Sequence, residues 1–188
     1  MHPLELFKYC PKCGSSHFVV NNEKSKRCAD CGFVYYFNSS AATVAFILNE
    51  RNELLVCRRG KEPKKGTLDL SGGFIDMYET GEEGVAREVL EETGVQMEID
   101  RLGFVHENYF YGDMPSNRNK LIYEISLFFY MKVPDAFAPI SESFMEDNSK
   151  EHLVWASLDE DIKMYPEFFK TELKNPTDTV KLFTTDKR

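Results

Sequence analysis

Short apolar runs alternate with polar turns along much of the chain, and this pattern predicts a series of β-strands. Two of the runs, residues 43–48 and 54–58, flank the polar stretch 49–52 and are typical of a strand hairpin. The other predicted strands are residues 68–70, 101–109, 121–133 and 152–156. The stretches between them are expected to be loops, at residues 60–66, 112–120 and 134–150.

One segment has helical periodicity instead. Between residues 81 and 92 the apolar positions recur one turn apart, and Gly94 stands where such a helix would end. The residues of this apolar face are Val85, Ala86, Val89 and Leu90. Shorter helices are expected at residues 158–162 and 166–174, and the last dozen residues are polar enough to fray. Helices interspersed with strands predict an α/β or α+β fold with a mixed sheet.

Four of the five cysteines form two identical pairs near the start of the chain. The motifs are Cys10-Pro-Lys-Cys13-Gly and Cys28-Ala-Asp-Cys31-Gly, separated by 14 residues, with a predicted hairpin tip at residues 21–22. This spacing predicts a closed four-sulfur Zn²⁺ site, which would be structural and would hold together a unit too small to fold alone. A redox dithiol or an iron–sulfur centre are the alternatives.

Chain length and charge narrow the possible functions. A chain of 188 residues and 21.8 kDa allows one α/β domain and a small extra module. No apolar run approaches the ~20 residues of a membrane span, and the first residues do not resemble a signal peptide, so we expect a cytoplasmic protein without a membrane partner. The net charge of −8 argues against sequence-independent nucleic-acid binding and suits a soluble enzyme that uses divalent cations.

Three carboxylates share one face of the predicted helix. Glu88, Glu91 and Glu92 lie one turn apart, opposite the apolar face. Like charges at this spacing destabilise a helix by a few tenths of a kcal/mol per pair, which hard divalent cations with oxygen ligands would offset. The alternative is a solvated acidic face.

The region around this helix resembles the Nudix box, G-x5-E-x7-R-E-U-x-E-E-x-G-U, in which U is aliphatic. The chain has Gly73, Glu79, then Arg87-Glu88-Val-Leu-Glu91-Glu92-Thr-Gly-Val at the required spacing, and every fixed position matches. The resemblance implies a Nudix fold, with a mixed sheet sandwiched between helices. It also implies hydrolysis of a nucleoside diphosphate linked to another moiety, with Mg²⁺ or Mn²⁺ as the catalytic cofactor.

The resemblance also implies the roles of individual residues. Glu88, Glu91 and Glu92 match the metal-binding glutamates, Glu88 is in addition a candidate base, and the carbonyl of Gly72 often joins the metal shell. The metal would neutralise charge on the pyrophosphate and activate water.

Further positions are assigned in the same way. Arg87 and Glu79 match the pair that braces the box loop and orients the glutamates, which makes both candidate catalytic residues. Many family members use another glutamate outside the box. Glu151 is the best placed and Glu146 the second, although both could equally be surface residues.

A zinc ribbon before a Nudix domain is similar to the NADH pyrophosphatase branch of the family. We therefore expect a ribbon over residues 1–38, a Nudix domain over 39–175 and a polar C-terminal tail over 176–188. The S-Q-P-W-P-F-P-x-S stretch of that branch is absent. Tyr111, 16 residues past the box, stands where a tyrosine marks dinucleoside polyphosphate hydrolases.

The expected substrate is a small nucleotide: an NAD(H)-like dinucleotide, ADP-ribose or another nucleotide sugar, or a dinucleoside polyphosphate. Arg58, Tyr109 and Tyr111 are candidate substrate-binding residues. Alternatively, the arginine belongs to a solvated loop and some of the aromatic residues belong to the core. The main rival function is a non-hydrolytic nucleotide sensor, or a recruiter whose ribbon binds RNA or a protein. Capped or free RNA ends stay possible partners, and a homodimer is the family-level expectation.

Overall fold

The computed structural model describes residues 2–58, 68–112, 121–135, 137, 152–159 and 168–187. The chain divides into two units, Met1–Ser39 and Ser40–Arg188, which are described separately.

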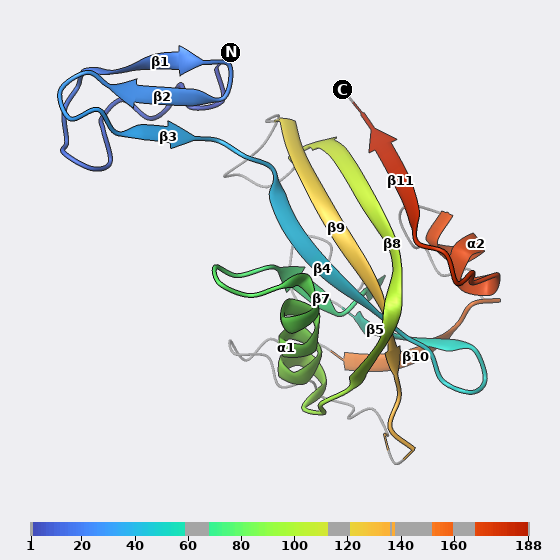
Figure 1. Cartoon of the computed structure of the whole chain (residues 1–188). Helices are drawn as coiled ribbons and strands as arrows, with labels where there is room; N and C mark the ends of the chain where they lie inside the picture. Colours follow the sequence, from blue (N-terminus) through green and yellow to red (C-terminus); the bar gives the residue numbers. More distant parts are fainter. Residues whose placement is uncertain are drawn as a thin grey trace. The chain divides into compact units, whose positions relative to one another are not determined.

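The N-terminal unit is built on a three-stranded antiparallel sheet (Figure 1). Its strands are β1 (Phe18–Asn22), β2 (Ser25–Cys28) and β3 (Val34–Tyr36), in that order. The turn between β1 and β2 lies beside the predicted hairpin tip. The buried core consists of Cys10, Phe18 and Cys28, with Cys31 and Phe33 packed against it. So small an apolar core predicts that the unit depends on a metal or another cross-link for its stability.

The larger sheet of the C-terminal unit has five strands in the order β11-β8-β9-β4-β7 (Figure 1). The strands are β4 (Ser40–Ile47), β7 (Gly72–Phe74), β8 (Glu98–Tyr111), β9 (Leu121–Lys132) and β11 (Lys181–Asp186). β9 runs parallel to β4 and antiparallel to β8, so the sheet is mixed, as the sequence predicts.

A second, antiparallel sheet has the order β10-β5-β6, formed by β10 (His152–Ser157), β5 (Glu53–Arg58) and β6 (Leu68–Asp69). The predicted hairpin between residues 43–48 and 54–58 is therefore wrong in its pairing. β4 and β5 meet at the single bridge between Leu48 and Leu54. Both edges of β4 are occupied by β7 and β9, so β5 pairs with β10 and β6 instead.

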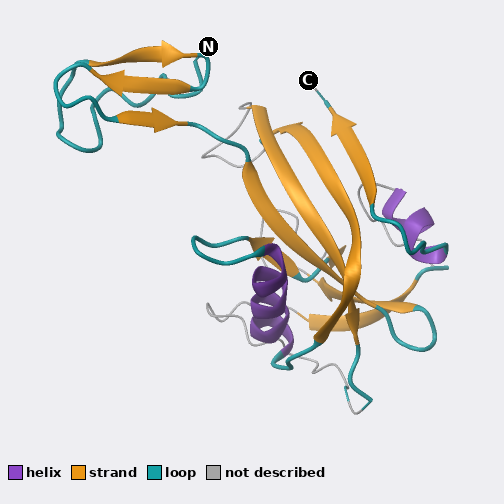
Figure 2. Ribbon diagram, in the orientation of Figure 1, coloured by secondary structure: helices purple, strands orange, loops and turns teal. Residues whose placement is uncertain are grey.

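Two helices cover opposite faces of the sheets (Figure 2). The helices are α1 (Gly81–Thr93) and α2 (Phe168–Lys174). Side chains alternate along β4, so that Phe46 packs in the cluster that contains α2, while Ala45 and Ile47 pack in the cluster that contains α1. This arrangement is the predicted sandwich. Within the described residues, no helix has the length and apolar character of a membrane span.

The end of the chain differs from the polar, fraying tail that we expected. Residues 181–186 form β11, which pairs in parallel with residues 104–109 of β8. Phe183 anchors the strand, because its ring packs edge-on against Phe104 at 5.4 Å between centroids. Residues 158–159 form a turn, the rest of the helix expected at 158–162 lies outside the described residues, and α2 corresponds to the helix expected at 166–174.

Candidate active site and cysteine cluster

Local capping fixes the two ends of α1. Thr80 and Glu83 form a capping box, in which the Glu83 amide donates to Thr80 Oγ1 at 3.2 Å and the Thr80 amide donates to Glu83 Oε2 at 2.7 Å. At the other end, Gly94 has φ of 71° and its amide donates to the Leu90 carbonyl at 2.8 Å. The predicted helix and its stop at Gly94 are confirmed. Because its ends are fixed, the helix presents its glutamates in one direction.

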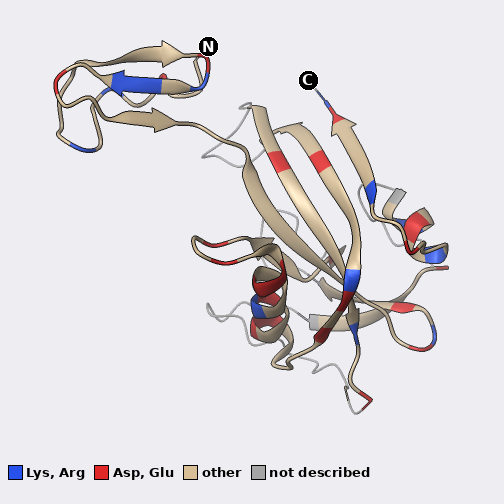
Figure 3. Cartoon of the chain, in the orientation of Figure 1, with Lys and Arg blue, Asp and Glu red and all other residues tan. Residues whose placement is uncertain are grey.

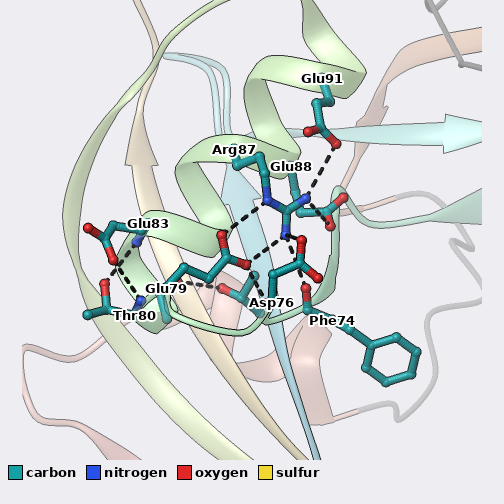
Figure 4. Close-up of polar contacts among 10 residues, drawn as sticks. Phe74, Asp76, Glu79, Thr80, Glu83, Arg87, Glu88 and Glu91 are labelled. Carbon is teal, nitrogen blue, oxygen red and sulfur yellow. Dashed lines mark hydrogen bonds and ion pairs between the residues drawn. The ribbon is translucent and has the colours of Figure 1, made fainter.

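Arg87 lies at the centre of the site, where it donates hydrogen bonds to three carboxylates and a carbonyl and forms a longer ion pair with Asp76 at 3.9 Å (Figure 4). Its Nε and Nη2 donate to the two oxygens of Glu79 at 3.2 and 2.8 Å. Its Nη1 donates to Glu88 at 2.8 Å and to Glu91 at 3.4 Å. Its Nη2 also donates to the Phe74 carbonyl at 3.2 Å. One guanidinium thus ties the loop before the helix to two of the predicted metal-binding glutamates.

Glu79 continues the brace into the loop. Its Oε1 accepts a hydrogen bond from the Asp76 amide at 2.6 Å. The bonds from Arg87 and from this amide hold the pKa of Glu79 below its ordinary value. In turn, Glu79 and Glu88 raise the pKa of Arg87, so the guanidinium stays charged.

Two glycines allow β7 to approach its neighbours closely. A Cβ at Gly73 would lie 2.3 Å from Glu88 Oε1. A Cβ at Gly72 would lie 2.2 Å from the Thr43 carbonyl, and Gly72 has φ of 148°. Thr43 in turn donates from Oγ1 to the Gly81 carbonyl at 3.2 Å, which fastens β4 to the start of α1. Only glycine at residue 73 leaves the Glu88 carboxylate in its place.

Glu92 has the most perturbed carboxylate of the site. Its Oε2 is buried and has no hydrogen-bond partner within the described residues, and the same is true of Ser71 Oγ. Burial raises the pKa of Glu92 to about 7 against the lowering effect of Ser71 and Gly72, and the carboxylates of Glu88 and Asp69 add to the rise. A buried oxygen without a partner, beside other hard oxygen donors, fits a divalent cation such as Mg²⁺ or Mn²⁺.

The three helix glutamates are not gathered around one point. Within the described residues, the four cysteines are the only group of three or more His, Cys, Asp or Glu whose ligand atoms lie within 4.8 Å of one another. Arg87 holds Glu88 and Glu91, and the Glu91 side chain is 54% exposed. The metal-binding roles of Glu88, Glu91, Glu92 and the Gly72 carbonyl therefore stay proposals.

The other predicted site residues lie apart from this network. Tyr109 stacks on Tyr123 across β8 and β9, with ring centroids 4.2 Å apart and planes at 6°. Tyr111 is exposed at the end of β8. Arg58 is placed as the last residue of β5, but its side chain is not among those described. Glu151 and Glu146 lie outside the described residues.

Sequence reasoning missed several residues of the site. They are Thr80 and Glu83 of the capping box, Asp76, Ser71 and the Phe74 carbonyl. The T-x-x-E spacing before the helix was a usable signal for the cap. The other contacts come from backbone groups or from burial, which residue type alone does not reveal.

A cavity of about 560 Å³ lies elsewhere in the C-terminal unit. Arg101, Tyr130, Lys132 and Trp155 are among its lining residues, and none of the box residues lines it. Its cations are already paired, for example Lys132 with Glu98 at 2.7 Å. It is therefore not the candidate active site.

The four cysteine sulfurs of the N-terminal unit form a compact group. Cys10 Sγ lies 3.7 Å from Cys31 Sγ, and Cys13 Sγ lies 3.6 Å from Cys28 Sγ. Four thiolates at the usual ~2.3 Å from a zinc ion stand about 3.8 Å apart, whereas disulfide sulfurs stand about 2.05 Å apart. The spacing therefore fits tetrahedral zinc ligation.

Backbone geometry supports the same interpretation. Gly14 and Gly32, with φ of 75° and 74°, each follow the second cysteine of a pair. Their amides donate to the carbonyls of Cys10 and Cys28 at 2.8 and 3.0 Å. Backbone amides at the second loop lower the pKa of Cys28 to about 6, whereas the neighbouring sulfurs of the group raise the pKa of Cys13 to about 12 against the backbone amide of Ser15. The two loops are thus matching turns that present sulfur to a common centre.

Comparison with known proteins identifies the family. The NUDIX domain family model matches residues 38–170. The chain belongs to the NUDIX domain family. The family and the sandwich fold are those that the sequence resemblance implied.

Individual relatives extend the comparison. The chain is 30% identical over 96 residues to the NAD-capped RNA hydrolase NudC of Vibrio parahaemolyticus, covering 51% of this chain and 36% of that protein. It is 42% identical over 69 residues to a MutT-like protein of Streptomyces ambofaciens, covering 37% and 43%. The match thus spans less than half the length of each of these curated relatives.

Among solved structures, the fold is similar to a NUDIX hydrolase from Nitrosomonas europaea. The TM-score is 0.64 at 22% identity, and the match covers 95% of this chain and 99% of the other.

Proposed function

We propose that this NUDIX protein is a divalent-cation-dependent pyrophosphohydrolase that cuts a phosphoanhydride in a nucleoside diphosphate linked to a second moiety. The observation that carries the proposal is the complete box, in which Arg87 joins Glu79 of the loop to Glu88 and Glu91 of the helix. A solvated acidic face would not require this brace, nor a buried Glu92 oxygen without a partner.

The residues that would hold Mg²⁺ or Mn²⁺ are Glu88, Glu91, Glu92 and the carbonyl of Gly72. A divalent ion bound at these oxygens would supply positive charge for the anionic pyrophosphate and would lower the pKa of a bound water. The chain's own contribution is positioning: the Arg87 brace limits where Glu88 and Glu91 can point. Glu88, held at 2.8 Å from Arg87, is the candidate base.

A dinucleotide is the first substrate class to test. The support comes from the relatives that carry the name NAD-capped RNA hydrolase and match about half of this chain. The missing S-Q-P-W-P-F-P-x-S stretch argues that any preference for NADH would use other contacts. ADP-ribose, other nucleotide sugars and dinucleoside polyphosphates belong in the same panel.

The test is release of nucleoside monophosphate or phosphate from each compound with Mg²⁺ or Mn²⁺, followed by chromatography. We expect turnover of at least one compound, abolished by chelation of the metal. Binding without release of product under either metal would contradict hydrolysis and would indicate the rival nucleotide sensor.

Matched variants assign the activity to the box. Glu91→Gln and Glu92→Gln should each lower turnover by about 100-fold or more with the fold retained, because each loses an anionic ligand. Glu82→Gln, in the exposed first turn of the same helix, is the control and should leave turnover unchanged. Normal turnover by Glu92→Gln would refute the metal role of that residue.

We further propose that Cys10, Cys13, Cys28 and Cys31 hold a structural Zn²⁺. A ribbon over residues 1–38 and a NUDIX domain over residues 39–175 are the domain boundaries that we propose, with β11 adding one strand from the following segment to the sheet of that domain. In this arrangement the zinc maintains the fold of the ribbon and takes no part in the hydrolytic chemistry.

A further inference from the structure

Tyr78 has an unfavourable backbone conformation in the loop between β7 and α1. Its φ is 74°, in the left-handed region that a bulky side chain rarely adopts. Asn52 is the other non-glycine residue with a positive φ in the described parts of the chain, and asparagine tolerates this region. A tyrosine in this conformation is therefore strained, and strained residues are frequent at functional sites.

A tight turn imposes the conformation. The Glu79 amide donates to the Asp76 carbonyl at 3.4 Å, which closes a four-residue turn with Tyr78 as its third residue. A positive φ at the third residue is typical of a type II turn, where glycine is the usual residue. The chain therefore has a tyrosine at a position that glycine would occupy without strain.

Packing within the fold does not offset this strain. Tyr78 is 100% exposed, and its neighbour Met77 is 81% exposed. Aromatic side chains stabilise a fold by burying their large apolar surface, and the Tyr78 ring buries none. The contribution of this ring must therefore come from something that binds to the protein.

The loop that carries Tyr78 is fastened to the candidate metal-binding glutamates. The next residue, Glu79, lies 2.8 Å from Arg87, and Arg87 also donates to Glu88 at 2.8 Å. Figure 4 shows these side chains around one guanidinium, with Asp76 of the same loop beside them. Tyr78 is thus adjacent in sequence to the brace of the candidate active site.

Charge limits what this loop can attract. Residues 72–94 contain seven Asp or Glu and a single Lys or Arg, which is Arg87. In Figure 3 the colour of Asp and Glu dominates the loop and α1. Because Arg87 is already shared among carboxylates, the segment offers a ligand no unpaired cation of its own. Its apolar surface at Met77 and Tyr78 suits an uncharged, flat group.

We propose that the Tyr78 ring stacks on the base of the nucleotide substrate. Every base has a π-face, so stacking suits a nucleoside diphosphate whichever base it carries. Met77 adds a polarisable apolar contact beside the ring. This inference rests on the proposed function, because it takes the box as the binding site of a nucleotide. A second copy of the chain is the alternative occupant of the loop, and the experiment separates the two.

Binding is measured by calorimetry on the full chain with Mg²⁺ and two probes. The probes are α,β-methylene ADP and methylenediphosphonate, which share a non-hydrolysable diphosphate and differ in the adenosine. Tyr78→Gly should weaken the binding of α,β-methylene ADP about fivefold or more, the effect of losing one stacking contact, and should leave methylenediphosphonate unaffected. Tyr78→Phe should bind both probes as the parent does, because stacking needs the ring and not the hydroxyl.

Further variants separate binding from folding. Tyr78→Gly relieves the strain, so its unfolding midpoint in denaturant should be no lower than that of the parent. Tyr78→Asn also tolerates a positive φ and lacks the ring, so it should lose the same affinity. Leu182→Ala is the control, because Leu182 is an exposed apolar residue of β11, at the opposite edge of the sheet from β7. It should bind both probes normally.

Three results would overturn the inference. One is equal affinity of the parent and Tyr78→Gly for α,β-methylene ADP. Another is a parent protein that binds this probe no more tightly than methylenediphosphonate. The third is a loss of self-association in Tyr78→Gly, measured by analytical ultracentrifugation, with the binding of both probes unchanged.

Failure of the proposed function would look different. A protein that binds α,β-methylene ADP through Tyr78, but releases no product from any compound of the panel, would keep the stacking role and refute hydrolysis. Turnover with the same KM in the parent and in Tyr78→Gly would keep hydrolysis and refute the stacking role.

Discussion

Arg87 and Glu79 form a two-point ion pair that spans eight residues and joins α1 to the loop before it. Both side chains are mostly buried, with exposed fractions of 29% and 15%. The planar guanidinium matches the two carboxylate oxygens, a geometry that the ammonium group of lysine cannot reproduce.

We therefore expect Arg87→Lys to lower kcat/KM by about 10- to 100-fold, the usual effect of losing a group that positions metal ligands. The positive charge is kept, so the loss would come from geometry. Glu79→Gln should behave in the same way, because it removes the other half of the pair. Steady-state kinetics with saturating Mg²⁺ provides the measurement. An unchanged kcat/KM in Arg87→Lys would contradict the role of the two-point contact between the guanidinium and Glu79.

Gly73 and Gly94 offer a contrast between two glycines of the box. Gly73→Ala would place a Cβ against the Glu88 carboxylate, so we expect activity to fall more than stability. At Gly94 an added Cβ would meet nothing, but φ is 71°. Gly94→Ala should therefore cost about 1 kcal/mol of stability and leave turnover near normal. Denaturant unfolding and activity assays on both variants check this. If the two variants lost the same stability and the same activity, the distinction between Gly73 and Gly94 would be wrong.

Zinc should be found at one ion per chain. Cys13→Ser or Cys28→Ser should abolish zinc binding and unfold the N-terminal unit, since its remaining core is too small to hold it together. Turnover of small nucleotides by the C-terminal unit should survive. Elemental analysis measures the metal, with Cys57→Ala as the control that keeps it, because Cys57 belongs to a separate buried cluster. Visible absorbance from iron, or a disulfide in place of metal, would contradict the prediction.

His106 predicts a loss of stability in mild acid. It is buried beside the Phe128 and Phe169 rings, its Nε2 lies 2.9 Å from Thr185 Oγ1, and burial lowers its pKa. Above a pH of about 6.5 the imidazole is neutral in both the folded and unfolded states, so its contribution is fully present. Below that pH the unfolded state takes up a proton that the folded state resists, and the free energy of unfolding falls.

The measurement is the free energy of unfolding of the parent chain and of His106→Gln between about pH 8 and pH 5. The variant should show a flatter profile over this range, because glutamine does not titrate. Parallel profiles for the two proteins would show that His106 contributes nothing to the pH dependence.

Local features were predictable from the sequence, and long-range ones were not. The ends of α1 follow from capping residues and Gly94, and the cysteine group follows from spacing within two short loops. In contrast, the partner of β5 depends on which edges of β4 are already occupied, and the pattern of a single strand does not contain that information.

The same reasoning applies within the site. The Arg87–Glu79 pair could be expected from the box, because both residues are fixed positions of the pattern. The unpartnered Glu92 oxygen depends on burial in the folded chain, beside Ser71 and Gly72, which no residue type specifies. The stacking of Tyr109 on Tyr123 depends in the same way on the register between β8 and β9.

The parallel strand β11 has a practical consequence for anyone who trims the chain. β11 pairs with one edge of β8, and its removal would leave backbone amide and carbonyl groups of residues 104–109 without hydrogen-bond partners. A version ending before Lys181 would therefore have an exposed strand edge, to which a strand of a neighbouring molecule could hydrogen-bond. If such a fragment self-associates, the loss of β11 is the first explanation to test. The self-association should not be taken as evidence that the intact protein is an oligomer.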